Sequence, residues 1–424
     1  MRPPECLNSD LIIIGGGASG LAAACIALKA GLQVTILEAR DRIGRKLLAT
    51  GNGRCNLLNT GPPVYFGDPS FAELVLRACP VKEVLAFFDS LGLITAQEEG
   101  GLVYPASNQA STVLEVLRLP LEKDPHCRIV CDAQVISLEC EGQGDGRDPS
   151  FQVRTASGDL YCAPCVLVAA GSPAQPQLSG SDSMYALLRR LGHRVISPRP
   201  ALTGLVTDPQ AVRWLKGLRL PAIATLCADG RPLCQTQGEV LFAQDGISGV
   251  CVMQLSRDAG QALIEKRQPI VYLDFSPLLG LTPRRMERRQ PADPDANGAA
   301  MLAFLKARTA RLPKEALLVG ALPRLLAQRL QDLPLDHLAD QLSAFPLPLR
   351  ALRGFEHAQV AAGGIDTRDV APETLASRLV PGLYLSGELL NVDGDCGGYN
   401  LLFAWATGIL AARAAAGYVS DHAH

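Results

Sequence analysis

The sequence predicts an α/β fold in which one nucleotide-binding domain is split by a β-rich insert and a small helical insert. Three observations lead to this fold class. Residues 10–38 read as a strand, a glycine turn, a helix, a second strand and an acidic residue. A strand-and-glycine pattern returns after residue 359, close to the C-terminus. Between these two parts the composition changes to short β-like runs, and then to a stretch rich in Leu, Ala and Arg.

The first strand, turn and helix carry a phosphate-binding pattern. Apolar residues 11–14 lead into Gly15-Gly16-Gly17-Ala18-Ser19-Gly20. Gly15 permits a tight turn, Gly17 lets the backbone approach a pyrophosphate, and Gly20 lets the helix pack closely on the strand. The start of the helix then directs unpaired N–H groups and a positive dipole end toward the phosphates. These residues predict a Rossmann-type dinucleotide site.

Glu38 follows the second strand, which we expect over residues 33–37. An acidic residue at this position is placed to accept hydrogen bonds from an adenosine ribose. A glycine-rich turn in an ordinary βα unit is the alternative interpretation. That alternative gives Glu38 no role, so the dinucleotide site is the preferred hypothesis.

The composition is that of a globular protein without a strong electrostatic preference for a partner. A length of 424 residues indicates several domains at ~150 residues each. A hydrophobic content of 48%, charged residues at 19% and a net charge of −2 exclude disorder and give no attraction to nucleic acid or anionic lipid. The 13 cysteines do not form a small disulfide scaffold. We therefore expect reduced thiols and a cytoplasmic, soluble chain.

Neither apolar stretch near the ends of the chain is expected to engage a membrane. Residues 11–14 are interrupted by glycines and do not resemble the apolar core of a signal peptide. Residues 401–412 are apolar but stop at Arg413, short of the ~20 residues that a membrane span needs.

The first part of the nucleotide-binding domain is expected over residues 1–197. A basic turn covers residues 40–46, and a loop rich in glycine and asparagine covers residues 49–56. Helical spacing predicts helices over 71–91 and 110–117. Strands are expected over 128–138 and 151–155, separated by a turn at 142–149. A buried strand over 166–171 ends in small residues that can lie beneath a cofactor.

Two inserts and a return segment follow. We predict a β-rich insert over 198–280, with strands at 222–228 and 240–242, and a helical insert over 281–347. Residues 348–424 return through the β insert to the second part of the nucleotide-binding domain, with strand patterns at 360–364 and 382–388. The last helix is expected to begin around Tyr399.

The late segment, residues 386–401, distinguishes between dinucleotides. Glu388 ends a strand and can bring its carboxylate to the ribityl or phosphate region of a long cofactor. Gly397 and Gly398 precede a helix, whose N-terminus would stabilise the negative charge of a reduced flavin at its pyrimidine edge. A nicotinamide dinucleotide does not need this second contact from the far end of the chain. FAD does, so we predict FAD as the cofactor.

The motifs together resemble the HI-type, YhiN-like family of FAD-binding oxidoreductases, which includes the bile-acid-operon reductase-like flavoproteins of gut bacteria. The resemblance is carried by residues 44–48, 51–56, 103–105, 246–249 and 387–405, in the expected order. It implies a split FAD domain with a β-rich and a helical insert, and loops 50–56 and 397–401 against the isoalloxazine. We expect cofactor contacts from Gly15, Gly17, Ala18, Ser19, Gly20, Glu38, Ala39, Arg45, Lys46, Thr50, Gly51, Asn52, Arg54, Cys55, Asn56, Val135, Ala170, Gly171, Gly387, Glu388, Asp393, Gly397, Gly398, Tyr399, Asn400 and Leu401.

Some positions depart from the family pattern. Val250 and Cys251 follow Gly249 where a proline is typical, and Asn391 replaces an aspartate. Phe403 stands where a polar residue is common, which alters the expected substrate cavity.

Tyr104, Tyr399 and Cys55 are the candidate catalytic residues. A phenol can protonate a carbanion equivalent, so Tyr104 and Tyr399 are candidate proton donors, the alternative being that they only line the pocket. Cys55 is a candidate catalytic thiol, or a small residue packed beside the flavin.

Other reactive residues are interpreted structurally. Cys162 and Cys165 have dithiol spacing but run into a buried strand, where residues three apart point to opposite faces, so we expect packing cysteines. Asp393 and Asp395 lack a His or Cys cluster at ligand spacing, so no metal site is predicted.

The leading functional hypothesis is an FAD-dependent oxidoreductase that takes hydride from NAD(P)H. Since only one phosphate fingerprint is present, NAD(P)H would dock transiently against the flavin face, in the cleft between the FAD domain and the inserts. The acceptor would be an apolar small molecule, such as the conjugated enone of a steroid or bile acid, and the chain a monomer or small homo-oligomer.

Two alternatives remain open. One is a flavin oxidase of a small amine that produces hydrogen peroxide. The other is a flavin-dependent RNA-binding or RNA-modifying protein that uses a helical stripe of Arg284, Arg285, Arg288 and Arg289, although a solvated helix face is the preferred interpretation of that stripe.

Overall fold

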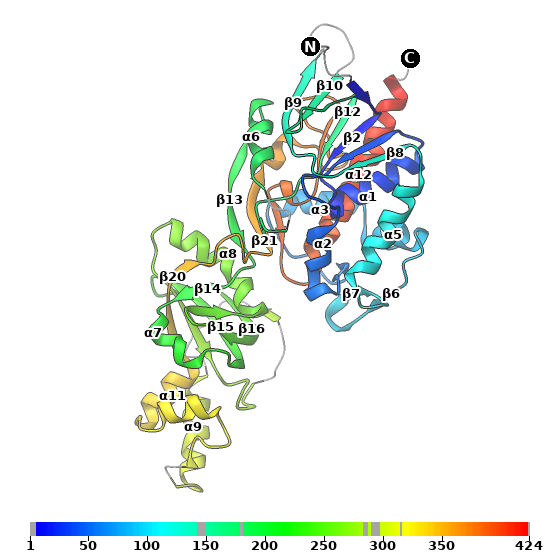
Figure 1. Cartoon of the computed structure of the whole chain (residues 1–424). Helices are drawn as coiled ribbons and strands as arrows, with labels where there is room; N and C mark the ends of the chain where they lie inside the picture. The colour runs from blue at the N-terminus through cyan, green and yellow to red at the C-terminus, as the bar shows by residue number, and fades with distance from the viewer. Residues whose placement is uncertain are drawn as a thin grey trace. The chain divides into compact units, whose positions relative to one another are not determined.

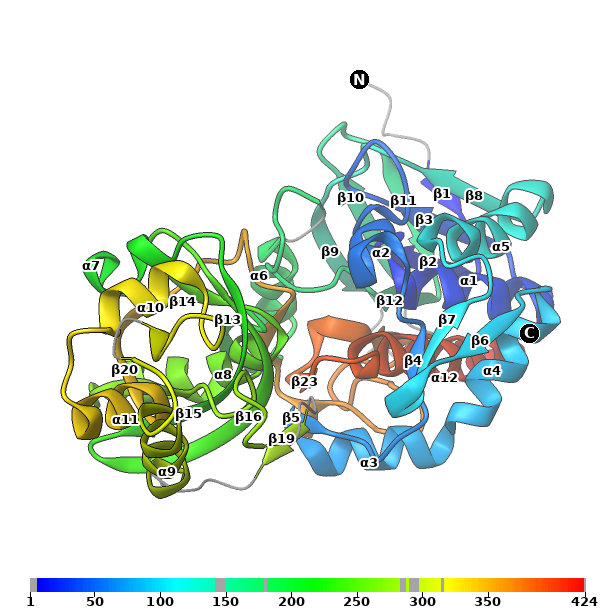
Figure 2. The ribbon, with the colours of Figure 1, turned by 90° about the horizontal axis from the view of Figure 1, so that it is seen from below.

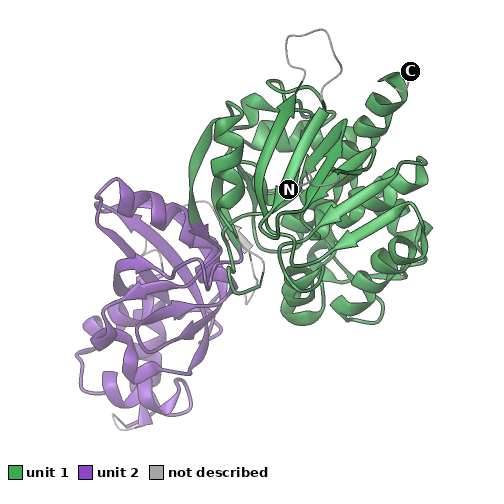
Figure 3. Ribbon diagram, turned by 45° about the horizontal axis from the view of Figure 1, so that its top comes forward, with its two compact units in different colours: residues 1–199, 360–424 green, residues 200–359 purple. Residues whose placement is uncertain are grey.

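The computed structural model describes residues 6–141, 150–178, 181–282, 287–289, 297–313 and 316–422. The chain forms two compact units, shown in Figure 3. Unit 1 consists of Met1–Arg199 and Val360–His424, and unit 2 consists of Pro200–Gln359. Each unit has its own hydrophobic core. The two ends of the chain therefore form one unit. The turn expected at residues 142–149 lies outside the described residues.

Unit 1 is organised around a parallel five-stranded sheet. Its order is β22 (Leu383–Leu385), β12 (Cys165–Val168), β2 (Leu11–Ile14), β3 (Val34–Leu37) and β8 (Cys127–Val130). Strands β2, β3 and β12 are buried along their whole length, as expected for a parallel sheet covered on both faces. Ile14 is in register with Leu37 and with Val168, and Val168 with Leu385. The carboxyl ends of four strands therefore meet at one edge of the sheet. The split Rossmann-type fold is confirmed.

Three helices flank this sheet. Helix α1 (Ala18–Lys29) packs against both α12 (Tyr399–His422) and α5 (Ala110–Lys123), as Figure 1 shows. Figure 2 shows α12 between α1 and α3 (Pro69–Ala78). Among the described residues, α12 alone is long and apolar enough to cross a membrane, and 67% of its apolar window is buried within the protein. Trp405 on α12 is fully buried and donates its indole N–H to the carbonyl of Leu57 at 2.9 Å. Helix α12 is thus a core helix of unit 1.

Smaller elements complete unit 1. Sheets of two to four strands are formed by β1 (Cys6–Asn8), β11 (Leu160–Ala163), β10 (Ser150–Thr155) and β9 (Val135–Glu141); by β4 (Leu58–Asn59), β7 (Leu102–Pro105) and β6 (Thr95–Gln97); by β23 (Val392–Gly394) and β5 (Tyr65–Gly67); and by β13 (Val195–Ala201) and β21 (Val360–Ile365). The remaining helices are α2 (Arg45–Ala49), α4 (Val81–Ser90) and α6 (Ser183–Arg190), together with 3-10 turns at Thr50–Gly53, Glu99–Gly101, Thr367–Asp369 and Gly387–Leu389.

Two local expectations in unit 1 were wrong. The helix expected over 71–91 is two helices, α3 and α4, because Pro80 lies between them and cannot continue α3. The strand expected over 128–138 is divided between β8 and β9, which belong to different sheets. Asp132 lies between these strands with φ of 54°, a left-handed conformation that ends a strand.

A disulfide joins Cys6 on β1 to Cys162 on β11, with their Cα atoms 6.0 Å apart. The expectation that all thiols are reduced, and that Cys162 only packs, was wrong. Strands β1 and β11 pair in parallel, with Asn8 opposite Cys162, which brings Cys6 close to it across 156 positions of sequence. Cys165 is a free, buried cysteine, so it does not form a redox pair with Cys162.

Unit 2 contains an antiparallel barrel. Its strands follow the order β15 (Arg219–Ala228), β18 (Pro269–Asp274), β20 (Phe345–Leu352), β14 (Leu205–Thr207), β17 (Gly246–Ser248) and β16 (Arg231–Phe242), and a pairing of β15 with β16 closes the ring. Strand β19 (Glu287–Arg289) adds to the outer edge of β16. The β-rich insert is therefore a closed sheet.

Helices accompany the barrel. These are α7 (Pro209–Val212), with a 3-10 turn at Arg213–Leu215, α8 (Val250–Ile264), α9 (Gly298–Thr309), α10 (Arg324–Leu330) and α11 (Leu335–Ser343). Helix α8 was not predicted, because its buried positions Val252, Leu255 and Ala259 lie within a segment dominated by strand-like runs. The helical arginine stripe was also wrong: Arg288 and Arg289 lie in strand β19, and residues 284–285 lie outside the described residues.

Candidate functional site

The glycine turn between β2 and α1 is fixed by close backbone contacts. Gly15 has φ of 113°, and a Cβ on it would lie 2.5 Å from the carbonyl oxygen of Ala169 at the end of β12. A Cβ on Gly20 would lie 2.0 Å from the carbonyl oxygen of Gly15. Both positions therefore require glycine for packing, as expected for the first and third glycines of a dinucleotide turn.

Gly17 is different, because its open side faces no protein atom. No described atom lies within 4 Å of a Cβ built on it. Gly17 is the N-cap of α1, and neither a side-chain cap nor an acidic residue in the first turn satisfies the N-terminal N–H groups. Ala18 and Ser19 form the start of this helix. The turn thus leaves space and donors for an anionic group at the helix N-terminus.

Glu38 lies next to the same turn. Its side chain accepts a hydrogen bond from the N–H of Gly16 at 2.8 Å and another from the N–H of Arg40 at 2.9 Å. The residue is only 8% exposed, and burial raises the pKa of its carboxyl group above the usual range despite these bonds. Ala39 beside it is exposed. The acidic residue after β3 is therefore held against the glycine turn between β2 and α1.

The late segment meets the early one at this edge of the sheet. Lys46 Nζ lies 2.6 Å from Glu388 Oε2, and Ser172 donates its hydroxyl to the same oxygen at 3.0 Å. Ser386, one residue before Gly387, shares a hydrogen bond of 2.5 Å with Ser19. A Cβ on Gly387 would lie 3.2 Å from Cβ of Ser19. Residues separated by more than 300 positions therefore share one site.

A second loop at the start of α12 is built from glycines. Gly397 and Gly398 have φ of 124° and 95°. A Cβ on Gly398 would lie 2.7 Å from the carbonyl carbon of Leu58 and 2.9 Å from Oδ1 of Asn56. Asn400 accepts from the N–H of Gly394 at 2.8 Å and donates to its carbonyl at 2.9 Å, so its side chain braces the loop. The first N–H groups of a helix have no partner within the helix, so those at the start of α12 can donate to a bound ligand.

The loop over residues 50–56 has a strained backbone. Gly51, Asn52, Gly53 and Cys55 all have positive φ, between 56° and 85°. Left-handed conformations at Asn52 and Cys55 are costly for residues with a Cβ, and such residues cluster at functional sites. Thr50 supports the loop by donating its hydroxyl to the carbonyl of Leu47 at 2.6 Å.

Arg54 and Tyr104 are stacked beside this loop. The guanidinium carbon of Arg54 lies 4.1 Å from the centroid of the Tyr104 ring. Arg54 also forms an ion pair with Glu98 and donates Nε–H to Oδ1 of Asn108 at 2.5 Å. Neither Glu98 nor Asn108 was anticipated from the sequence, because they come from separate segments around β7 without a motif of their own.

Burial raises the pKa of all three candidate catalytic residues and so favours their protonated forms. Cys55 is fully buried, and desolvation raises the pKa of its thiol to about 12, which disfavours a thiolate. Burial raises the pKa of Tyr104, although the Arg54 charge opposes this, and burial and then Asp395 raise the pKa of Tyr399. Both phenols are therefore protonated at neutral pH. The hydroxyl groups of Tyr104 and Tyr399 make no hydrogen bond within the described parts of the chain.

Two buried polar atoms of unit 1 have no hydrogen-bond partner among the residues described: Oδ1 of Asn56 and the hydroxyl of Tyr185. Asn56 faces Gly398, at the start of α12. Tyr185 lies on α6, and burial, followed by the charges of Glu388 and Asp182, raises the pKa of its hydroxyl. Buried polar atoms without a partner are costly, so each of these two atoms requires a further partner, such as an ordered water or a bound group. Sequence analysis missed Tyr185, because an aromatic residue at apolar helical spacing has no signal of its own.

These features fit FAD. The open side of Gly17 and the N-terminus of α1 suit a pyrophosphate, and Glu38 suits a ribose. Gly171 after β12 has no atom of the described residues within 4 Å of a Cβ, which leaves room beside the strand end. The free acceptor of Asn56 beside the start of α12 suits an N–H at the edge of a flavin.

The other expected cofactor residues are less clearly placed. Arg45 pairs with Asp41 at 2.9 Å and donates to the carbonyl of Gln177. Val135 and Asp393 are buried, and Ala170 and Leu401 are partly exposed. Their contacts with a cofactor stay predictions. Among the described residues, no group of three or more His, Cys, Asp or Glu side chains is arranged to hold a metal ion.

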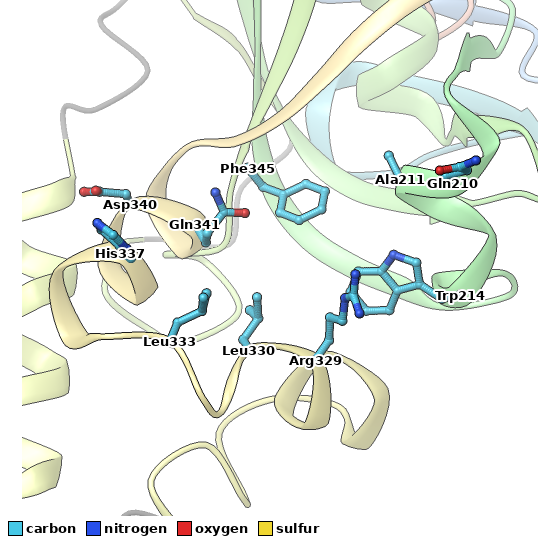
Figure 4. Close-up of a pocket in the computed structure, with 10 residues that line it drawn as sticks. All are labelled: Gln210, Ala211, Trp214, Arg329, Leu330, Leu333, His337, Asp340, Gln341 and Phe345. Atoms are coloured by element: carbon cyan, nitrogen blue, oxygen red, sulfur yellow. The ribbon is translucent and has the colours of Figure 1, made fainter.

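A separate pocket of about 520 Å³ lies within unit 2 and is shown in Figure 4. No residue of the predicted site belongs to it. It is lined by Gln210, Ala211, Trp214, Arg329, Leu330, Leu333, His337, Asp340, Gln341 and Phe345.

The chain is similar to known proteins over nearly its whole length. A family model described as "HI0933-like protein Rossmann domain" matches residues 9–414. The chain is 39% identical over 419 residues to 3-dehydro-bile acid delta(4,6)-reductase of Clostridium scindens, with 95% of this chain and 98% of the relative covered. It is 27% identical over 408 residues to ribosomal RNA dihydrouridine synthase of Haemophilus influenzae, with 94% and 96% covered.

A solved structure of similar fold is the open conformation of a flavocytochrome c3 fumarate reductase. It matches with a TM-score of 0.50 and 13% identity, covering 97% of this chain and 79% of that chain. At this identity the match shows the fold alone. Together with the site, the sequence comparisons support an oxidoreductase with FAD as its cofactor. The match over nearly the whole length shows that the chain belongs to the HI0933-like family of Rossmann-domain flavoproteins.

Proposed function

We propose that the protein saturates a carbon–carbon double bond conjugated to a carbonyl group, with a reduced nicotinamide dinucleotide as the electron donor. The observation that carries this proposal is the 39% identity, over 95% of the chain, to a reductase named for the delta(4,6) bonds of a 3-dehydro bile acid. Those bonds are conjugated to a 3-ketone.

The second relative supports the same reaction class. Its name describes formation of dihydrouridine, which is uridine with the double bond of its ring saturated. That bond is also conjugated to a carbonyl group. The two named activities therefore share one chemical step, although a steroid and a ribosomal RNA differ greatly in size. We therefore infer that this chain shares the reduction of an activated alkene with both relatives.

Different residues of unit 1 would bind different parts of the cofactor. Glu38 would bind the adenosine ribose, and the turn at Gly17 would bind the pyrophosphate. The paired Lys46 and Glu388 would lie near the ribityl chain, and Asn56 with the N-terminus of α12 near the flavin edge. When bound, FAD would accept hydride from the donor and pass it to the alkene.

The protein would also supply a proton to the α-carbon of the acceptor. Tyr104 and Tyr399 are the candidates, because both phenols are protonated at neutral pH and have hydroxyl groups without a partner among the described residues. Proton delivery by a positioned acid contributes typically 10²–10⁴-fold to a rate. We favour Tyr104, since Arg54 holds its ring in place.

The experiment is an anaerobic assay with purified, FAD-loaded protein. NADH and NADPH would each be tested for flavin bleaching, followed by addition of 3-keto-4-ene steroids, 3-keto bile acids and cyclohexenone. We expect bleaching by at least one donor and reoxidation by an enone, but not by the corresponding saturated ketone. Failure of every enone to reoxidise the bleached flavin would overturn the proposal.

A second candidate is reduction of a base in RNA, favoured by the 27% identity over 408 residues to the ribosomal RNA enzyme. The same bleached protein would be mixed with ribosomal RNA, and the product digested and analysed for dihydrouridine. Formation of dihydrouridine without any turnover of enones would favour this candidate. Formation of hydrogen peroxide from amines without a nicotinamide donor would instead favour an oxidase.

A further inference from the structure

Arg54 is held in position from three directions. Its Nε–H donates to Oδ1 of Asn108 at 2.5 Å, and its Nη2 forms an ion pair with Glu98. The flat guanidinium also lies over the ring of Tyr104, 4.1 Å from the centroid. A planar cation that is stacked and hydrogen-bonded in this way loses little freedom when it binds a further group. Arg54 is therefore preorganised.

These contacts leave part of the guanidinium unused. An arginine side chain carries several N–H donors in a fixed plane and no acceptor. Nε and Nη2 of Arg54 are engaged, whereas Nη1 has no partner among the described residues. The side chain is 36% exposed. The free N–H groups of Nη1 can thus be reached by a ligand.

The position of Arg54 relates it to the reacting end of the cofactor site. It lies between Gly53 and Cys55, both with positive φ, in the strained loop that continues into Asn56. Asn56 lies against Gly398 at the start of α12. An ordinary surface ion pair contributes little to stability and does not require a strained loop. A purely structural role for Arg54 therefore does not explain the strained backbone of this loop.

We propose that Arg54 binds the carbonyl oxygen of the acceptor and holds its negative charge during reduction. This inference rests on the proposed function. It makes Arg54 a catalytic residue, in place of the cofactor contact expected from the sequence. The acceptor class is a molecule with an accessible carbonyl oxygen conjugated to the reacting double bond.

The charge balance of the reaction explains why such a donor is needed. When bound, reduced FAD would supply hydride to the β-carbon, and the alkene electron pair would move to form an enolate. The carbonyl π electrons then reside on the oxygen, where N–H groups of Nη1 stabilise them. A proton from Tyr104 reaches the α-carbon and restores the carbonyl group, and the phenol is reprotonated from solvent. The nicotinamide donor of the proposed function would supply the hydride for the next turnover.

A substituted phenol is a suitable probe of this oxygen site. A phenolate is planar and carries its charge on an oxygen conjugated to a ring, as an enolate does, but it cannot be reduced. We would titrate 4-chlorophenol into the oxidised, FAD-loaded protein at several pH values and follow the flavin absorbance. Wild type should bind the phenolate form, so affinity should rise with pH until the phenol is fully ionised.

Arg54→Gln is the test variant and Arg118→Gln is its control. Arg118 on α5 pairs with Glu115 and Glu122 and is 35% exposed, so it matches Arg54 in charge, exposure and the presence of a carboxylate partner. We expect Arg54→Gln to weaken phenolate binding roughly tenfold or more, and Arg118→Gln to leave it unchanged. If enones are substrates, kcat/KM for them should fall roughly a hundredfold in Arg54→Gln. Arg54→Lys should restore only part of either loss, since it keeps the charge but not the planar fork.

FAD affinity separates the possible outcomes. Arg54→Gln should bind FAD as wild type does. If it loses FAD and phenolate to the same extent, or if its phenolate affinity equals that of wild type, the inference is wrong. A wild-type protein that reduces no enone, but binds phenolate through Arg54, would refute the proposed function and leave the oxygen site in place.

Discussion

The ammonium group of Lys46 lies 2.6 Å from a carboxylate oxygen of Glu388, although 342 positions separate them. Their side chains are 19% and 22% exposed, so the pair is largely shielded from water. It joins the two ends of the chain at the carboxyl edge of the parallel sheet, where the cofactor is proposed to bind. The two parts of the split domain are thus connected at the proposed cofactor site as well as in the hydrophobic core.

Removing the Glu388 charge should weaken both the fold and the cofactor site. We expect Glu388→Gln to lower the free energy of unfolding by about 1–3 kcal/mol, because Lys46 would lose a charged partner in a shielded position. FAD affinity should fall as well. Arg77→Gln is the control, since its pair with Glu73 is about 70% exposed on both sides. Urea unfolding and flavin fluorescence titration measure the two effects; equal behaviour of the two variants would contradict this prediction.

The contact between α1 and α12 should depend on Gly408. A Cβ there would lie 2.3 Å from the backbone oxygen of Ser19, so Gly408→Ala should separate the helices and destabilise the protein by about 1–3 kcal/mol. Gly417 lies on the same helix, and apart from the adjacent helix backbone no described atom lies within 4 Å of a Cβ built on it. Gly417→Ala should therefore stabilise the protein by about 0.5–1 kcal/mol. Thermal unfolding should show a lower midpoint temperature for Gly408→Ala and a higher one for Gly417→Ala. A Gly408→Ala protein as stable as wild type would contradict the close packing of α1 and α12.

The Cys6–Cys162 disulfide should be detectable by counting thiols. Eleven of the 13 cysteines are not part of this disulfide, so eleven thiols should titrate in denaturant before reduction and 13 after it. Because the bond closes a loop of 156 positions, its loss in Cys6→Ser should cost about 2–5 kcal/mol. Titration of all 13 thiols in unreduced protein would show that the bond does not form.

Asp366 should contribute stability that disappears in acid. The bonds from Arg368 are the largest cause of the lowered pKa of this carboxyl group, whose side chain is 7% exposed. Since the pKa of Asp366 in the folded protein lies below the ordinary value of 3.8, the contribution is present above that value and is lost as the pH falls through the folded pKa. Asp366→Asn should therefore be about 1–2 kcal/mol less stable at pH 7, and its deficit should shrink in acid.

Asp89→Asn is the control for this pH dependence. Asp89 is exposed at the end of α4, and its side chain has no ion pair in the described structure. In urea unfolding between pH 7 and pH 3, the difference in free energy of unfolding between Asp89→Asn and wild type should not change with pH. A deficit of Asp366→Asn that is independent of pH would contradict the assigned cause.

The fold could be predicted where its determinants are local in sequence. The β2 strand, the turn at Gly15 to Gly20, helix α1 and Glu38 all lie within one short stretch, so one pattern specifies them. The late glycine pair before α12 was recognised for the same reason. Helix α8 was missed because its apolar residues at helical spacing lie among strand-like segments. The break at Pro80 was missed because residues on both sides of it have helical spacing, which predicted one continuous helix.

The parts of the site that could not be predicted depend on partners distant in sequence. The Cys6–Cys162 bond follows from the pairing of β1 with β11, and the three partners of Arg54 come from residues 98–108. Tyr185 looks like an ordinary core residue until its hydroxyl is found without a partner. Such contacts are set by tertiary structure, and a single sequence contains no periodic signal for them.

The most direct test of the account is FAD binding by wild type and Gly17→Ala. Gly17 has φ of −89° and ψ of −169°, which alanine adopts readily, and the added methyl group would meet no protein atom. We expect wild type to bind one FAD per chain, and Gly17→Ala to unfold at the same urea concentration but bind FAD at least roughly tenfold more weakly, because its methyl group would occupy the place of the pyrophosphate. A wild-type protein that stays colourless with FAD, or a Gly17→Ala protein with undiminished affinity, would contradict the central claim.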